Sequence, residues 1–151
     1  MIPTQQPEAK YIHPLARFVT KEAIALLLKI DITKIKEVRC WARVILVIGE
    51  RLSRFVSYAD LPPILTSELP NKADIVRWRK RWQKNNRQAP QFWLEFYEQK
   101  FTRAISIDQL RAWGQIIGIM KFGFSPAGLQ QLRYCYSQNK ARLESLLQIA
   151  A

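Results

Sequence analysis

Apolar residues recur at spacings of three and four along most of this chain, which is the periodicity of amphipathic α-helices. The clearest run extends from Thr33 to Ser57 and predicts one long helix packed lengthwise on others. Its apolar seam is formed by Ile35, Val38, Ala42, Ile45, Gly49, Leu52 and Val56. A second run, from Pro126 to Ile149, keeps the same spacing. These two segments are expected to be the longest helices of the fold.

Capping signals divide the rest of the chain into shorter predicted helices. Asn71 with Asp74, and Ser106 with Gln109, have the spacing of a capping box, and Ser125 before a proline is a strong helix start. Together, periodicity and capping signals predict helices over about residues 14–29, 33–57, 71–86, 90–103, 106–123 and 126–149.

No strand is predicted, because no stretch alternates apolar and polar residues between Asn-Gly or Asp-Gly turns. The expected fold is therefore all-α, a compact bundle of five to six helices. Residues 13–151 are expected to form a single helical domain. Two prolines before it, Pro3 and Pro7, indicate an extended N-terminal arm over residues 1–12.

Composition adds a strong positive charge to this picture. The chain has 151 residues, 48% of them hydrophobic, and a formal net charge of +12. A chain of this size can bury a core, so the charge decorates a folded domain and points to a polyanionic partner. No apolar run approaches the roughly 20 residues of a membrane span, and the N-terminus does not have the pattern of a signal peptide. Two distant cysteines, Cys40 and Cys135, favour reduced thiols and a cytoplasmic location.

The positive charge is densest between Asn71 and Arg87, where seven cations stand against one acid, Asp74. Like charges this close repel one another, so an anionic partner is the simplest reason for them. Trp78 and Trp82 lie among these cations and are either buried core anchors or stacking surfaces for exposed bases. The predicted nucleic-acid-binding residues are Lys36, Arg39, Arg43, Arg77, Arg79, Lys80, Arg81, Lys84 and Arg87.

Backbone contact is expected rather than sequence reading of a duplex. The chain does not contain a recognisable short helix-turn-helix, although the turn at residues 123–125 is similar to one. Contact with a single strand or an RNA-containing duplex, chosen by shape, fits better and leaves open whether the partner is RNA or DNA. A membrane partner is not expected, because an interfacial helix needs a broad apolar face.

Catalysis is not expected, and neither catalytic residues, metal ligands nor a cofactor are predicted. The five glycines form no GxxxxGK[ST] or GxGxxG loop, and the GxxxG of Gly114 and Gly118 predicts close helix packing. His13, the single histidine, precedes a proline, which suits a helix boundary better than a general base. Glu95 and Glu98 are one helical turn apart, and a solvated face is a better interpretation of them than a metal site.

The outline resembles the small helical subunits of multisubunit CRISPR effector complexes. The likeness covers the architecture of the whole chain: its length, the two long helices over Thr33 to Ser57 and Pro126 to Ile149, and two cationic faces. Those faces comprise Lys36, Arg39 and Arg43 and the stretch from Arg77 to Arg87. That family has no diagnostic motif. The resemblance implies a basic all-α protein without catalytic residues, which stacks in several copies along a guide–target duplex in antiviral defence.

The leading hypothesis is a non-catalytic nucleic-acid-binding subunit of a ribonucleoprotein, with other protein subunits, including copies of itself, as further partners. The alternative is a structural or adaptor protein that docks acidic proteins through the same basic faces. A third hypothesis is a metal-dependent nuclease around Glu95 and Glu98. Salt-dependent binding to generic single strands separates the first two, and metal-dependent cleavage lost in Glu95→Ala would support the third.

Overall fold

Three antiparallel strands occupy the region from Ile35 to Val56, where the sequence pattern predicted one long helix. The computed structural model of the protein describes residues 13–150, in which five α-helices accompany this three-stranded sheet. The fold class is therefore mixed α/β, and the prediction of an all-α bundle is wrong. The extended arm predicted for residues 1–12 lies outside the described residues.

The chain divides into two compact units, Met1–Pro63 and Ile64–Ala151. We call them the sheet unit and the helical unit, after the elements that their described residues form. A single domain over residues 13–151 stays a prediction.

The described part of the sheet unit combines one α-helix and three strands with short 3-10 turns. These elements are η1 (Pro14–Phe18), α2 (Lys21–Leu28), η2 (Ile32–Lys34), β1 (Ile35–Cys40), β2 (Ile45–Gly49), β3 (Leu52–Val56) and η3 (Tyr58–Asp60). The helix predicted over residues 14–29 is interrupted before α2, because Thr20 adopts an extended conformation and caps that helix. Its hydroxyl accepts a hydrogen bond from the backbone N–H of Ala23 at 3.1 Å.

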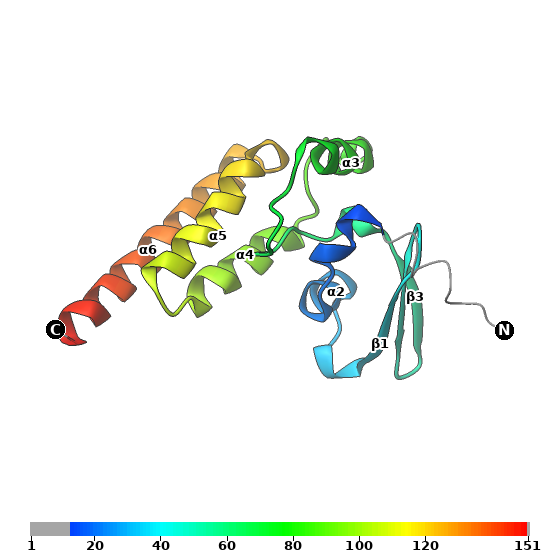
Figure 1. The fold of residues 1–151 in the computed structure, drawn as a ribbon, viewed down its shortest axis with the longest axis horizontal. Coiled ribbons are helices and arrows are strands. Elements are labelled where there is room, and N and C mark those ends of the chain that lie inside the picture. The colour runs from blue at the N-terminus through cyan, green and yellow to red at the C-terminus, as the bar shows by residue number, and fades with distance from the viewer. Residues whose placement is uncertain (1–12, 151) are drawn as a thin grey trace. The chain divides into compact units, whose positions relative to one another are not determined.

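The three strands form an antiparallel meander in the order β1-β2-β3. Ile45, Val47 and Val56 lie on one face of the sheet and are buried. Ala23 and Ile24 of α2 are also fully buried, and Figure 1 shows α2 beside the sheet. The core of this unit is therefore mainly aliphatic.

Irregularities in the sheet explain why its sequence looks helical. A bulge between Ile35 and Glu37 adds an unpaired residue to β1, so the inward positions there do not keep a period of two. Glu50 and Arg51 alone connect β2 to β3, and Arg51 has the left-handed conformation (φ 56°) that an Asn-Gly turn would have signalled. Both faces of β2 are apolar, which conceals the alternation. The strand preference of its valine and isoleucine residues then decides the outcome.

The described part of the helical unit contains α3 (Lys72–Trp82), α4 (Phe92–Arg103), α5 (Ile107–Ile119), the 3-10 turn η4 (Lys121–Gly123) and α6 (Pro126–Ala150). The four helices predicted here are confirmed, together with the signals that begin three of them. Asn71 and Asp74 form a reciprocal capping box at the start of α3. The hydroxyls of Ser106 and Ser125 each accept a backbone hydrogen bond at 3.0 Å, at the starts of α5 and α6.

Aromatic side chains fill the core of the helical unit. Trp78 and Trp82 of α3 meet Trp93 of α4 edge to face, with ring centroids 6.1 and 5.1 Å apart, and all three side chains are buried. Helices α4, α5 and α6 lie side by side, and α6 runs back along α5 (Figure 1). Trp78 and Trp82 are thus core anchors and not stacking surfaces for bases.

Candidate nucleic-acid interface

The only acid of the basic stretch is used at the start of α3. Asp74 is fully buried, and its carboxylate accepts a hydrogen bond from the backbone N–H of Asn71 at 3.0 Å. The guanidinium of Arg77 lies 3.4 Å from the same carboxylate, and Arg77 is itself half-buried. Because Asp74 is buried beside it, this carboxylate compensates the charge of Arg77 at the helix start.

Six further cations of the stretch are all exposed: Lys72, Arg79, Lys80, Arg81, Lys84 and Arg87. Within the described residues 13–150, no acidic side chain pairs with Arg79, Lys80, Lys84 or Arg87. Acidic side chains of the described residues therefore do not relieve the mutual repulsion of these four cations, and a bound anion would relieve it.

Two of these cations, Arg79 and Arg87, line a surface pocket together with Gln83 and Phe122. The pocket has a volume of about 630 Å³, and none of its lining residues is acidic. The guanidinium carbon of Arg79 lies 4.5 Å from the centre of the Phe122 ring, over its face. Guanidinium groups bind phosphate, and flat rings and guanidinium planes accept stacked bases. We call this site the Arg79–Phe122 pocket.

Phe122 is held in place by the aromatic core beneath it. Its ring centroid lies 5.6 Å from that of the buried Trp82. The next residue, Gly123, approaches so closely that a Cβ atom there would lie 2.5 Å from the indole ring of Trp82, so this position requires glycine. The backbone N–H of Ala89 donates to the carbonyl of Gly123 at 2.8 Å. These contacts fix η4 against α3 and present Phe122 beside the cations.

The loop after α3 turns Arg87 back toward the helix. Asn86 and Arg87 are both left-handed, with φ of 54° and 59°, and the backbone N–H of Arg87 donates to the carbonyl of Trp82 at 3.0 Å. The side-chain amide of Asn85 donates to the carbonyl of Gln88 at 2.9 Å and closes the turn. Left-handed conformations are costly for a residue such as arginine, and strain of this kind concentrates at functional sites.

Two residues of this pocket were not among the predicted binding residues. Gln83 had a signal in the sequence, because Arg79, Gln83 and Arg87 follow one another at intervals of four, which is the spacing of one helix face. Phe122 had none, since it lies on a different element and only the tertiary fold brings it to α3.

The cations predicted from the first half of the chain do not lie on a helix. Lys36 and Arg39 are on β1, and Arg43 is in the loop between β1 and β2. Lys36 and Arg43 are exposed, whereas Nε of Arg39 donates to the Glu37 carboxylate at 2.6 Å. That hydrogen bond lowers the pKa of Glu37. These residues therefore do not form the basic helix face that was expected.

Other candidate chemistry is limited. Glu95 is exposed and Glu98 half-buried on α4, and among residues 13–150 no three His, Cys, Asp or Glu side chains group as metal ligands would. The lack of catalytic activity stays a prediction. His13 accepts a hydrogen bond at Nδ1 from the backbone N–H of Leu15 at 3.0 Å, which confirms its role at a helix boundary. In the part of the chain that the structure describes, no helix is long and apolar enough to cross a bilayer.

Comparison with known proteins does not assign this interface to a family. No family model matches the chain, and neither a curated protein nor a solved structure matches it. The CRISPR resemblance rested on two long predicted helices. One of them, from Thr33 to Ser57, is not a helix, because this segment contains the sheet. A function must therefore be inferred from the Arg79–Phe122 pocket and the charges around it.

Proposed function

We propose that this protein binds nucleic acid without catalysis, and that α3 and the Arg79–Phe122 pocket hold the sugar–phosphate backbone. The observation that carries this proposal is the lining of the pocket. It combines two guanidinium groups, an amide and an aromatic ring, with no acidic side chain. Lys80 and Lys84, exposed on the same stretch, extend the positive surface beyond the pocket.

Each lining group matches a part of a nucleotide. Arginine presents a planar fork of donors that fits phosphate oxygens, and the amide of Gln83 can both donate and accept hydrogen bonds. Phe122 with Arg79 above it offers a flat surface for a base. An acidic protein surface would also neutralise the cations, but carboxylates carry no aromatic ring that could stack on this surface. The lining therefore favours nucleic acid over the adaptor alternative.

Salt dependence tests the proposal. A fluorescein-labelled single strand, as DNA and as RNA, is titrated with protein at several salt concentrations while anisotropy is followed. The logarithm of affinity should fall linearly with the logarithm of salt concentration, because bound cations release counterions. The double variant Arg79→Gln/Arg87→Gln should bind all sequences more weakly. Its slope should be shallower by about 1.4, from a loss of about 0.7 for each phosphate contact on a single strand.

A matched control distinguishes binding at the Arg79–Phe122 pocket from binding that depends only on net charge. Arg39→Gln/Arg43→Gln removes the same formal charge from the sheet unit. It should leave the slope close to that of the wild-type protein. If the two double variants weaken binding equally, binding follows net charge and the pocket is not the site. If no strand binds, the adaptor alternative takes the place of this proposal.

A protein of this kind would act in the cytoplasm as part of a larger ribonucleoprotein, with other subunits or further copies of itself. Purification of tagged protein from its native host should recover nucleic acid together with protein partners. Nuclease treatment should remove the nucleic acid and weaken the Arg79-dependent association. Partners that bind the Arg79→Gln/Arg87→Gln variant as well as the wild type would instead be held by another surface.

A further inference from the structure

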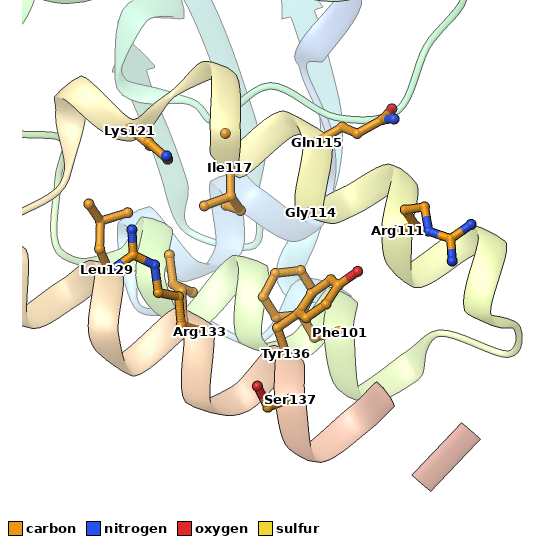
Figure 2. Close-up of a pocket in the computed structure, with 12 residues that line it drawn as sticks. Phe101, Arg111, Gly114, Gln115, Ile117, Lys121, Leu129, Arg133, Tyr136 and Ser137 are labelled. Atoms are coloured by element: carbon orange, nitrogen blue, oxygen red, sulfur yellow. The ribbon is translucent and has the colours of Figure 1, made fainter. Parts of the chain in front are cut away.

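A second cavity lies between α5 and α6, in the same unit as the Arg79–Phe122 pocket. Its volume is about 520 Å³, within the range of pockets that enclose small organic groups. Its walls are mostly apolar and include Phe101, Ile117, Leu129, Leu132 and Tyr136 (Figure 2). We call it the α5–α6 groove.

The two glycines of the GxxxG motif have different roles in this groove. A Cβ atom at Gly114 would lie 2.8 Å from the ring of Tyr136, so this glycine lets the ring rest against α5. Tyr136 also meets Phe101 edge to face, with centroids 5.4 Å apart. At Gly118, one turn later, a Cβ atom would meet nothing within 4 Å. The close packing predicted for this motif is thus found at Gly114, whereas Gly118 leaves the groove open.

Cations lie at both ends of the groove. Figure 2 shows Arg111 at one end and Lys121 with Arg133 at the other, and no acidic residue lines the cavity. Arg111 has only an exposed pair with Asp108 at 3.8 Å, which is weak. In the described chain neither Lys121 nor Arg133 has an ion pair. From Arg111 to Ile119, the last residue of α5, the helix rises by roughly 12 Å, which separates the two ends of the groove.

The groove and the Arg79–Phe122 pocket meet at η4. Lys121 lines the groove, and the adjacent residue Phe122 lines the pocket. A positively charged path therefore leads from Arg79 and Arg87, past η4, to the groove. Both sites belong to one unit, so the path does not depend on how the two units are arranged.

We infer that the α5–α6 groove receives an unstacked base of a single-stranded nucleic acid whose backbone also occupies the Arg79–Phe122 pocket. The inference rests on the proposed function and adds to it a substrate class, because a base must leave its stack to enter the groove. Apolar and aromatic walls bind the face of any base, and cations at the two ends bind the phosphates on either side of it. The preference is for single strands over duplex, with little base specificity.

The placement of the cations distinguishes a strand from an amphiphilic anion such as a fatty acid. An amphiphile carries its charge at one end and would leave the cation at the other end of the groove without a partner. A strand carries a phosphate on each side of every base and engages both ends. The cationic path to the first pocket likewise fits a polymer that is longer than the groove.

The test compares three labelled probes of equal length by anisotropy: a thymine single strand, a strand of abasic sites with the same phosphates, and a duplex. The wild-type protein should bind the thymine strand roughly 5- to 100-fold more tightly than the abasic strand, as expected for one enclosed base. The duplex should also bind more weakly than the thymine strand. Gly118→Leu, which places a side chain in open space, should bring the affinity for the thymine strand closer to that for the abasic strand, and base stacking at Phe122 and Arg79 should account for the difference that remains.

Two further variants keep the test decisive. Gln130→Leu adds the same side chain at an exposed position of α6 that does not line the groove, and it should bind like the wild type. Ser137→Phe fills the groove from α6 and should act like Gly118→Leu, which covers the case in which one variant does not fold. Circular dichroism checks the fold of each.

The outcomes distinguish a failure of the inference about the groove from a failure of the proposed function. Equal binding of the thymine and abasic strands, or wild-type affinity in the filled variants, overturns the inference about the groove and leaves the proposed function standing. Duplex binding as tight as single-strand binding does the same. If none of the three probes binds, the proposed function itself fails.

Discussion

The sheet unit and the helical unit are both basic, but they arrange their cations differently. Residues 13–63 contain nine Lys and Arg against five Asp and Glu, and residues 64–150 contain fourteen against six. In the sheet unit, Arg39 is bonded to Glu37 two positions away along β1. In the helical unit, Arg79 and Arg87 have no described acidic partner and line a pocket together with the aromatic ring of Phe122. Net charge alone therefore does not locate a site.

The geometry of the two secondary structures underlies this difference. Side chains two positions apart lie on the same face of a strand, so Glu37 and Arg39 meet. Side chains four positions apart lie on the same face of a helix, so Arg79 and Gln83 are brought together, and the turn after α3 adds Arg87. The sheet unit also exposes an aromatic side chain, Phe55, which is 62% exposed. Phe55 therefore offers nucleic acid an alternative aromatic contact in the sheet unit, and an experiment must distinguish it from the proposed site.

The largest effect is expected in the core that supports the pocket. Trp82→Ala removes a buried indole that contacts Trp93 and Phe122, and should lower the free energy of unfolding by about 3–5 kcal/mol. Val76→Ala, at a position 63% exposed on the same helix, should change it by less than about 0.5 kcal/mol. Urea denaturation followed by circular dichroism measures both. A small loss in Trp82→Ala would contradict the assignment of this tryptophan to the core.

Glycines in the two units should respond in opposite directions. A Cβ atom at Gly49 of β2 would lie 2.2 Å from the backbone carbonyl oxygen of Lys34, so Gly49→Ala should destabilise the protein by about 1–3 kcal/mol. Gly118→Ala adds a methyl group to open space within a helix and should stabilise it by about 0.5–1 kcal/mol. Denaturation midpoints compare the two variants. A stabilising Gly49→Ala would contradict the close approach to Lys34, and a destabilising Gly118→Ala would contradict the open space at that position.

The helix caps offer a smaller and nearly equal effect in the two units. Thr20→Ala and Asn71→Ala each remove a side-chain acceptor from a helix start, and each should cost about 1 kcal/mol. Thermal denaturation compares them with the wild type. If Asn71→Ala is neutral while Thr20→Ala is not, the capping box does not hold the start of α3.

The smallest effect concerns the two thiols. Burial raises the pKa of Cys40, and burial together with the nearby Glu98 carboxylate raises that of Cys135. A raised pKa leaves less thiolate at about pH 8, so both thiols should react more slowly with iodoacetamide in the folded protein than in urea, where the pKa is about 8.5. Their contribution to stability should be lost as the pH rises above that value. Cys40→Ser and Cys135→Ser assign the rates, and equal rates in folded and unfolded protein would contradict the burial.

The sequence predicted the helical unit well because its signals are local. Capping residues such as Asn71 and Ser106 act on the backbone within three positions, so their effect can be read without the tertiary fold. The sheet could not be predicted in the same way. Its bulge at β1 and the left-handed Arg51 remove the regular alternation and the turn residues by which strands are recognised.

The candidate site, like the fold, could be predicted only in part from the sequence. The cations of α3 were predicted, because charge density is a property of the sequence alone. Phe122 was not, because its place beside Arg79 depends on the packing of Gly123 against Trp82. The two alternatives for Trp78 and Trp82 could be resolved only by burial, which depends on the whole helical unit. Periodicity and charge therefore indicate a binding surface, and the tertiary fold determines its shape.

Photocrosslinking tests the central claim most directly, because it compares the two units within one molecule. A single strand that carries 5-iodouracil is bound to the protein and irradiated, and the crosslinked residues are located by mass spectrometry. We predict crosslinks to Phe122 and to peptides that contain Arg79 and Arg87, and their loss in the Arg79→Gln/Arg87→Gln variant. Crosslinks confined to the sheet unit, for example at the exposed Phe55, would contradict the account.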